Sequence, residues 1–271
     1  MIHICFNLDE KYVFPCKVLI QSILKHTKEQ ITFHFIGIDK TNMATKMKCK
    51  FYPKPDLSYF TNDNLGDYFY FSQAAMYRLL IPFMIEADKV LYMDIDMLVR
   101  NDIKHLYATN VKYIGAVPDP CEVLRKSMLD VEVEHYYNSG LILFNSKNIR
   151  KDFPDYKERL LEAQKNHKLY LKDQDILNIV FRNNVTTLDY KWNIDSYNLK
   201  EKTESKRVSV LKDRAYKRPS IVHCMGKNKW WTLEGMNFGS EWDKYNIFKD
   251  KKSLHRNQRK VICGLEVITN Y

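Results

Sequence analysis

The chain has 271 residues, of which 45% are apolar, 13% aromatic and 28% charged. This apolar content supports a substantial buried core, which excludes an intrinsically disordered chain and leaves room for one large domain or two small ones. The formal net charge of +10 favours an anionic partner such as a nucleotide, an anionic membrane face or nucleic acid.

The N-terminal residues and the cysteines indicate the compartment. The run from Met1 to Phe6 resembles a strand rather than a signal peptide, because polar residues follow at Asn7 and Asp9. No apolar run is long enough to span a bilayer. The six cysteines show no C-x-x-C spacing, which indicates reduced thiols. We therefore expect a cytoplasmic protein.

Apolar periodicity predicts alternating strands and helices from the N-terminus onward. Residues 2–8 and 31–38 are predicted strands, and residues 13–25 between them form a predicted amphipathic helix. This β-α-β unit predicts parallel strands joined by a right-handed crossover. A helix over residues 72–84 is expected to lead into the next strand.

The second half of the chain continues the alternation. Its predicted strands cover residues 112–117 and 140–145, and its predicted helices cover residues 156–164 and 174–182. Strands that recur between helices predict an α/β fold with a doubly wound sheet. The sequence shows no clear domain boundary before about residue 230.

Two acids interrupt an apolar run between Lys89 and Val99. Asp94 and Asp96 are spaced i, i+2, so in a strand their side chains would point to the same face. Two carboxylates that point together repel each other unless a cation or a base lies between them. Oxygen ligands at the carboxyl end of a strand suit Mg²⁺ or Mn²⁺, often shared with substrate phosphates. For an isolated pair, a strand-end turn or a helix cap is the alternative.

A histidine, a glycine and a lysine follow a later apolar stretch. His223 ends this stretch, with Gly226 three residues later and Lys229 six residues later. An imidazole can complete an oxygen-rich metal site, a glycine permits close backbone approach, and a lysine supplies a mobile charge for phosphate. A hydrogen-bonded core histidine is the alternative for His223.

Two predicted helices carry further polar residues. Arg78 lies in the apolar face of the first, where an unpaired charge would be unfavourable. It therefore needs an anion, either a nearby carboxylate or a phosphate. Asp173, Gln174 and Asp175 open the second, where Asp173 is suited to cap the helix N-terminus.

Together these motifs resemble the signatures of glycosyltransferase family 8, which includes bacterial lipopolysaccharide galactosyl- and glucosyltransferases and the glycogenins. The resemblance runs from residue 2 to about residue 231, with six motifs in the family's order. The motifs are Asn7-Leu8-Asp9-Glu10-Lys11-Tyr12, Tyr77-Arg78-Leu79, Leu91-Tyr92-Met93-Asp94-Ile95-Asp96, Tyr137-Asn138-Ser139-Gly140, Asp173-Gln174-Asp175 and His223-x-x-Gly226-x-x-Lys229. The resemblance implies a GT-A fold with a mixed, mainly parallel sheet over residues 1–235, and a C-terminal extension over residues 236–271.

The resemblance further implies that a hexose is transferred from UDP-galactose or UDP-glucose with retention of anomeric configuration. It assigns the metal, Mn²⁺ or Mg²⁺, to Asp94, Asp96 and His223. The other implied donor contacts are Asp9, Lys11 and Tyr12 at the uracil, Arg78, Gly226 and Lys229 at the diphosphate, Asn138, Ser139, Asp173 and Gln174 at the transferred sugar, and Ile95. Asp119 would lie toward the acceptor. Lys11 departs from a small polar residue expected beside the uracil, and Ser139 departs from a frequent alanine.

The implied chemistry suits these residues. The metal, Lys229 and Arg78 would stabilise the negative charge that develops on UDP as it leaves. Asp173 and Gln174 are the candidate catalytic residues, and Asp173 is chemically the better nucleophile. We expect front-side attack assisted by the leaving phosphate.

Residues 241–260 combine lysines and arginines with aromatic residues. Such a segment suits the anionic inner leaflet, where each basic residue contributes on the order of 1 kcal/mol. A solvated basic tail is the alternative. We expect a peripheral enzyme on the inner face of the plasma membrane, with a glycan or glycolipid acceptor such as a lipopolysaccharide core or another surface polysaccharide.

Two other functions are kept as alternatives. A self-glucosylating or protein-modifying glycosyltransferase would transfer the sugar to protein, including tyrosines of its own chain. A nucleic-acid-binding protein would account for the positive charge and the basic, aromatic tail. It would leave the acid pair, Arg78 and His223 without a role, so no nucleic-acid partner is expected.

Overall fold

The structure is a computed structural model that describes the chain except for residues 42–46, 61–72, 197–209, 227–228, 231–238 and 246–271. The chain divides into two compact units, each made of segments separated along the sequence. The first unit contains Met1–Asn7, Gln30–Met93 and Tyr107–Asp189, and the second contains Leu8–Glu29, Asp94–Leu106 and Tyr190–Tyr271. The apolar run that carries the acid pair therefore passes from the first unit into the second directly before Asp94.

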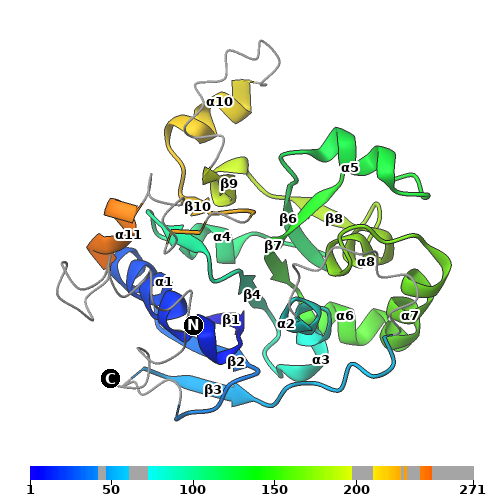
Figure 1. The fold of residues 1–271 in the computed structure, drawn as a ribbon, viewed down its shortest axis with the longest axis horizontal. Coiled ribbons are helices and arrows are strands. Elements are labelled where there is room, and N and C mark those ends of the chain that lie inside the picture. The colour runs from blue at the N-terminus through cyan, green and yellow to red at the C-terminus, as the bar shows by residue number, and fades with distance from the viewer. Residues whose placement is uncertain (42–46, 61–72, 197–209, 227–228, 231–238, 246–271) are drawn as a thin grey trace. The chain divides into compact units, whose positions relative to one another are not determined.

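Within the described residues of the first unit, seven strands form one sheet (Figure 1). They are β1 (Ile2–Asn7), β2 (Ile31–Ile36), β3 (Cys49–Tyr52), β4 (Val90–Met93), β6 (Ile114–Pro118), β7 (Tyr137–Phe144) and β8 (Val185–Thr187). Their order in the sheet is β3-β2-β1-β4-β7-β6-β8. β7 is antiparallel to β4 and β6, whereas the other neighbouring pairs are parallel. The expected α/β fold with a mixed, mainly parallel sheet is confirmed.

Burial explains why the central strands have almost continuous apolar sequences. Every residue of β4 and of β7 is buried. A strand covered on both faces needs apolar side chains on both, so it loses the alternation of a half-exposed strand. β1 and β2 are parallel and in register from Ile2 with Ile31 to Asn7 with Ile36, as the predicted β-α-β unit requires.

The first unit also contains a series of short helices. They are α2 (Gln73–Met76), the 3-10 turn η2 (Tyr77–Leu80), α3 (Ile81–Met84), α5 (Glu122–Met128), α6 (Ser146–Asp152), α7 (Tyr156–Asn166) and α8 (Asp173–Val180). The prediction of helical structure over residues 72–84 is confirmed for the described residues 73–84, which form α2, η2 and α3 in succession. Pro82 has no amide hydrogen to donate to the Arg78 carbonyl, so it interrupts the helix and lies in the first turn of α3. The Ile81 amide donates to that carbonyl instead.

Aromatic side chains anchor the helices of the first unit. The Phe153 ring lies 4.7 Å from Tyr113 and 5.6 Å from Phe181, measured between ring centroids. Tyr156, at the start of α7, lies 6.0 Å from Phe181 at the end of α8. Each buried ring contributes about 1.5–3 kcal/mol. This packing holds α8, whose first residue is Asp173.

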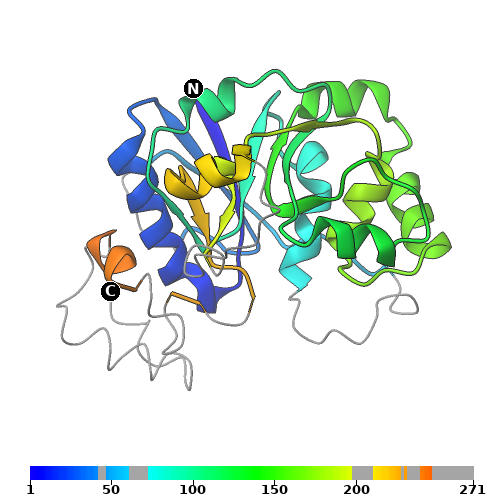
Figure 2. The same cartoon turned by 90° about the horizontal axis from the view of Figure 1, so that it is seen from above.

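The second unit contains a smaller sheet and further helices. Its elements are η1 (Glu10–Tyr12), α1 (Val13–His26), β5 (Met97–Val99), η3 (Tyr190–Trp192), β9 (Ile194–Asp195), α10 (Val210–Lys217), β10 (Ile221–His223) and α11 (Gly239–Tyr245), and α4 (Lys104–Ala108) begins in it. The strand order is β5-β10-β9, with β10 antiparallel to β5 and parallel to β9. α11 lies beside α1 (Figures 1 and 2).

Two aromatic residues of the expected membrane-associating segment belong to the core of the second unit. Trp242 is 2% exposed and Tyr245 is 7% exposed, and both pack in a cluster that includes Trp230. The membrane interpretation is therefore wrong for these two side chains, which are not available to a lipid surface. The rest of the basic stretch, residues 246–271, lies outside the described part. Within that part, no helix combines the length and the hydropathy needed to cross a bilayer.

Three polar side chains form a hydrogen-bonded chain across β1, β2 and β3. His3 Nδ1 lies 3.0 Å from His34 Nε2, and His34 Nδ1 lies 3.0 Å from the Tyr52 hydroxyl. Burial, with smaller contributions from the neighbouring His3 and Lys50, lowers the pKa of His34 to about 4. Between about pH 4 and pH 6.5, the folded protein therefore keeps His34 neutral, whereas an unfolded chain would protonate it.

We expect His34 to make the fold less stable in acid. Its pKa in the folded state is below the ordinary 6.5, so the unfolded chain binds more protons below that pH. The free energy of unfolding should therefore fall by about 3 kcal/mol as the pH drops through this window. Urea unfolding at neutral pH and at the acid end of the window measures this change. His34→Gln should flatten the dependence, and equal slopes in both proteins would contradict the assignment.

Candidate functional site

The acid pair lies on a turn between two sheets. β4 ends at Met93 and β5 begins at Met97, so Asp94 and Asp96 belong to the connecting residues. β4 belongs to the large sheet and β5 to the small one. The prediction that both acids lie in one strand is therefore wrong, since the chain must leave the first sheet before it enters the second. The turn, rather than a strand's alternation, orients the two carboxylates.

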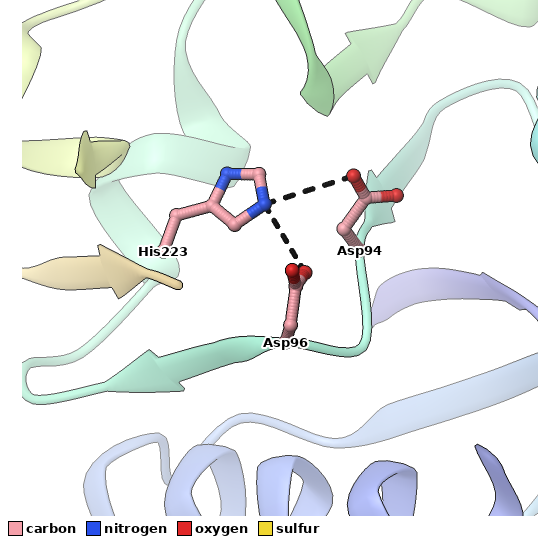
Figure 3. Close-up of side chains that lie close together, drawn as sticks. All are labelled: Asp94, Asp96 and His223. Atoms are coloured by element: carbon pink, nitrogen blue, oxygen red, sulfur yellow. Dashed lines mark ion pairs between the residues drawn. The ribbon is translucent and has the colours of Figure 1, made fainter. Parts of the chain in front are cut away.

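His223 joins the acids because of strand pairing in the second unit. β10 ends at His223, which is paired with Met97, the residue after Asp96. His223 Nε2 lies 3.1 Å from Asp96 Oδ1 and 3.7 Å from Asp94 Oδ2, and the three side chains point toward one another (Figure 3). One ligand atom from each residue can be chosen so that all three lie within 4.8 Å of one another. The candidate metal ligands are thus brought together within one unit.

The residues that follow β10 hold the acidic turn in place. The Cys224 amide and the Trp230 indole N–H both donate to the Asp96 carbonyl oxygen, each at 2.8 Å. Lys229 Nζ forms an ion pair with the Asp96 carboxylate and donates to the Cys224 carbonyl oxygen at 3.0 Å. Backbone and side chain of Asp96 are therefore both bound by the segment from 223 to 230.

Neighbouring charged groups determine the ionisation of Asp96 and Lys229. Burial by itself would raise the pKa of Asp96, but Lys229 and His223 hold it well below its usual range. Burial likewise opposes the charge of Lys229, yet Asp96 raises the pKa of the ammonium group. The pair is therefore ionised on both sides, and Asp96 carries a negative charge at neutral pH.

The backbone conformation at position 226 requires a glycine. Its φ is +83°, in the left-handed region that residues with a Cβ rarely adopt. A Cβ built at this position would have no neighbour within 4 Å, so crowding by the protein does not explain the glycine. Residues 227–228 lie outside the described part.

The candidate uracil contacts lie at the start of α1. The Tyr12 amide donates to the Asp9 carbonyl oxygen at 2.9 Å, and this closes the 3-10 turn η1. Lys11 Nζ lies 5.0 Å from the centre of the Tyr12 ring. Tyr12 and Ile95 are partly buried against the core of the second unit. These residues, like the candidate metal ligands, belong to the second unit.

Arg78 finds its anion in the first unit. Its Nε lies 3.1 Å from Asp173 Oδ2, and the two side chains are 7% and 2% exposed. Its Nη1 donates to the Ser139 carbonyl oxygen at 2.6 Å and to the Ser139 hydroxyl at 3.1 Å. The guanidinium also lies over the Tyr92 ring, 4.6 Å from the ring centre. Of the two anions expected for Arg78, the structure contains the carboxylate.

Gln174 is the centre of a polar network in the same unit. Its Nε2 donates to Asp119 Oδ2 at 3.2 Å and to the Tyr136 hydroxyl oxygen at 3.3 Å. Its Oε1 accepts from Asn138 Nδ2 at 3.2 Å and from the Ser139 amide at 2.9 Å, and the Ser139 hydroxyl oxygen lies 3.3 Å from it. Residues up to 55 positions away in the sequence thus form hydrogen bonds with the side-chain amide of Gln174.

Asp173 does not cap the N-terminus of α8, contrary to the sequence-based expectation. The N-cap of α8 is Lys172, with φ of +46° and no capping hydrogen bond from its side chain. Asp173 is the first helical residue, and its carboxylate binds Arg78 and the Ser139 hydroxyl. The amides that precede the helix, of Tyr170 and Leu171, donate to Asp175 instead, both at 2.6 Å.

Two residues next to these clusters were not among those expected from the sequence. Tyr136 is fully buried, and its hydroxyl donates to Asp175 Oδ1 at 2.5 Å while it accepts from Gln174. Asn193 accepts from the ring of His223 at 2.9 Å. Tyr136 directly precedes the motif that begins at Tyr137, so its position in the sequence could have indicated that it belongs to the site. Asn193 belongs to no motif, and only the fold reveals it.

Comparisons with known proteins agree on one family. The family model described as glycosyl transferase family 8 matches residues 3–235. Glycosyltransferase GlyF of Streptococcus pneumoniae serotype 4 is 27% identical over 243 residues, which cover 82% of this chain and 55% of GlyF. General stress protein A of Bacillus subtilis strain 168 is 31% identical over 175 residues, 59% of each chain. Lipopolysaccharide 1,2-glucosyltransferase of Escherichia coli is 27% identical over 252 residues, 84% of this chain and 73% of the relative.

The match spans little more than half the length of GlyF and of General stress protein A. Among solved structures, an active-site mutant of LgtC is similar with a TM-score of 0.76 and 22% identity, covering 94% of this chain and all of the other. Another LgtC structure is described as a galactosyltransferase in complex with donor and acceptor sugar analogues. At this identity the structural likeness shows the GT-A fold alone.

Proposed function

The chain belongs to glycosyl transferase family 8, and from this premise we propose that it is a metal-dependent, retaining hexosyltransferase. The donor would be UDP-galactose or UDP-glucose, and the acceptor a glycan or glycolipid such as a lipopolysaccharide core or another surface polysaccharide. The observation that carries the proposal is the convergence of Asp94, Asp96 and His223, with ligand atoms within 4.8 Å of one another.

The three side chains fit a divalent cation. Two carboxylates and one imidazole supply hard oxygen and nitrogen donors, a set that suits Mn²⁺ or Mg²⁺. Nε2 of His223 faces both acids, while the ring's other nitrogen is engaged by Asn193. Asp94, Asp96 and His223 would hold the cation, which would supply positive charge to the diphosphate of the leaving UDP.

When the metal and the donor bind, Lys229 would exchange its ion pair with Asp96 for an ion pair with the diphosphate. Its ammonium group now neutralises Asp96. A cation held by Asp96 would take over that role, so the lysine would become available to a diphosphate oxygen. Glycine at position 226 allows its positive φ without strain. Lys229 thus supports the same proposal from outside the ligand set.

The network of the first unit would contact the transferred sugar. Gln174 is held by hydrogen bonds on both ends of its amide, and its Oε1 already accepts from Asn138 Nδ2 and from the Ser139 amide. An oxygen engaged in this way is a poor nucleophile. Asp173 is bound by Arg78 and Ser139. These contacts favour front-side attack over a covalent intermediate on Gln174, with both residues orienting the sugar.

UDP release from UDP-galactose and UDP-glucose, with Mn²⁺ and with chelator, tests the proposal. We expect slow metal-dependent hydrolysis of one of the two sugar nucleotides without added acceptor, which would also identify the donor. Mn²⁺-dependent UDP binding without hydrolysis would indicate a strict need for acceptor. A protein that binds neither Mn²⁺ nor UDP, but binds DNA with a steep salt dependence, would overturn the proposal.

Lys229→Met should weaken donor binding without weakening binding of the metal. A lost hydrogen bond from a charged donor corresponds to about 1.5–3 kcal/mol, or roughly 10- to 100-fold in the affinity for UDP. Because Lys229 competes with the cation for Asp96, the affinity for Mn²⁺ alone should stay the same or rise. Calorimetry with UDP in the presence of Mn²⁺, and electron paramagnetic resonance with Mn²⁺ alone, measure the two effects. Unchanged UDP affinity would contradict the role of Lys229.

A further inference from the structure

We propose that Asn193 is a positioning residue that aims His223 at the candidate metal site, an inference that rests on the proposed function. Asn193 and His223 are both 4% exposed. The side-chain oxygen Oδ1 of Asn193 lies 2.9 Å from Nδ1 of the His223 ring. The opposite ring nitrogen, Nε2, is the atom that faces Asp94 and Asp96.

The direction of this hydrogen bond determines what the ring can do. A carbonyl oxygen accepts and does not donate, so the shared hydrogen belongs to Nδ1 of His223. With Nδ1 engaged by Asn193, the ring presents Nε2 to Asp96, whose Oδ1 lies 3.1 Å away. Nε2 can donate a hydrogen to that carboxylate in the metal-free protein, and a divalent cation would replace this hydrogen. The hydrogen bond from Nδ1 to Asn193 persists in both cases, so the ring is already aimed at the place where the cation would bind.

The backbone holds Asn193 in place independently of the ring. It directly follows the 3-10 turn η3, and its amide donates to the Tyr190 carbonyl oxygen at 3.1 Å. β9 begins at the next residue and is parallel to β10, with His223 paired to Asp195. The Ser220 amide donates to the Lys191 carbonyl oxygen at 2.8 Å, which joins the two segments before the strands begin. Asn193, directly before β9, and His223, at the end of β10, are therefore held by two strands that are fixed to each other.

The chemical type of residue 193 is also informative. A neutral amide fixes the ring orientation without adding a third negative charge beside Asp94 and Asp96. Groups that hold the far nitrogen of a metal-binding histidine contribute strongly to metal binding, and their loss typically lowers metal affinity or activity about 10- to 100-fold. Asn193 has the position and the chemistry of such a group.

The test measures Mn²⁺ binding to the full chain by electron paramagnetic resonance, without donor or acceptor. Asn193→Ala should weaken Mn²⁺ binding about 10- to 100-fold, whereas Asn193→Asp keeps an acceptor at the same place and should bind Mn²⁺ far better than the alanine variant. Asn101→Ala is the matched control. Asn101 Nδ2 donates to the Ser220 hydroxyl at 3.3 Å, so this variant also loses an amide contact beside β10 but none to the ring. It should bind Mn²⁺ like the unmodified protein.

A spectroscopic signature separates positioning from general loosening. Long-range ¹H–¹⁵N spectra, with His223→Gln for assignment, should show a hydrogen on Nδ1 of His223 in the metal-free protein. Asn193→Ala should weaken or remove the signal of this hydrogen-bonded Nδ1–H. The measurement on the unmodified protein needs no variant at residue 193, so it tests the inference even if the alanine variant fails to fold. A His223 ring without a hydrogen on Nδ1 would overturn the inference.

The outcomes distinguish the inference from the function on which it rests. If the unmodified protein binds Mn²⁺ and Asn193→Ala binds it equally well, the role of Asn193 is overturned and the metal site stands. If the unmodified protein and His223→Gln are equally unable to bind Mn²⁺, with or without UDP, the proposed metal site itself is overturned. Weaker binding in Asn193→Ala, recovery in Asn193→Asp and no change in Asn101→Ala would establish the positioning role.

Discussion

Asp96→Asn is expected to lower turnover of the UDP-sugar about 1,000-fold, equivalent to roughly 4 kcal/mol of lost transition-state stabilisation. The substitution keeps the size of the side chain but removes the negative charge that a divalent cation needs. The hydrogen bonds from Cys224 and Trp230 go to the Asp96 carbonyl oxygen, so the backbone of the turn should persist. We therefore expect activity to fall far more than stability does.

The stability change of this variant should nevertheless be measurable. Lys229 loses its ionic partner, but its side chain is 28% exposed, so water can solvate part of the charge. We expect unfolding to become easier by about 1–3 kcal/mol. Steady-state kinetics and denaturant unfolding on the same preparation give both numbers. Asp102→Asn is the matched control, because Asp102 accepts from the Lys104 amide at 2.9 Å and, among the described residues, forms no hydrogen bond or ion pair with Asp94, Asp96 or His223. Normal turnover in Asp96→Asn would remove Asp96 from the site.

Arg78→Met is expected to destabilise the first unit by about 3–5 kcal/mol, because it leaves the buried Asp173 carboxylate without its cation. Asp173 is 1% exposed, so water cannot replace the guanidinium. The variant also removes two hydrogen bonds to Ser139. Replacing the second partner as well, in Arg78→Met with Asp173→Asn, should recover part of the lost stability, since no unpaired charge remains.

The same variant decides between the two anions expected for Arg78. If the arginine served the diphosphate alone, Arg78→Met would raise the KM for the donor and leave the free energy of unfolding unchanged, which would contradict the ion pair with Asp173. Arg159→Met provides the control for the loss of an arginine. Its pair with Asp155 is 2.9 Å long, but the side chains are 46% and 50% exposed, so we expect a change of less than about 1 kcal/mol.

Much of the fold followed from local patterns in the sequence. The strand and helix positions in β1, α1, β2, β7 and α7 were predicted to within a few residues, because each carries a periodicity that depends only on its own side chains. The helical residues 73–84 were also predicted, but their division into α2, η2 and α3 was not, since Pro82 cannot donate a backbone hydrogen bond. Local patterns also indicated which residue types could form a metal site.

The partners of buried polar groups followed from no local pattern. Arg78 was expected to need an anion, but the choice of Asp173 depends on two segments almost a hundred residues apart meeting in one unit. The burial of Trp242 and Tyr245 likewise depends on α11 packing against α1. From composition alone, the same aromatic and basic residues suited a membrane surface.

By itself, therefore, the sequence determined the fold class, the family and the identity of the three candidate metal ligands. These depend on side-chain chemistry and on order along the chain. The tertiary structure decided that Asp94 and Asp96 lie on a turn between β4 and β5, that Lys229 forms an ion pair with Asp96, and that Asn193 lies within hydrogen-bonding distance of the His223 ring. These depend on which strands pair and on which polar atoms burial brings within hydrogen-bonding distance, and a buried polar group must find its partner wherever the fold supplies one.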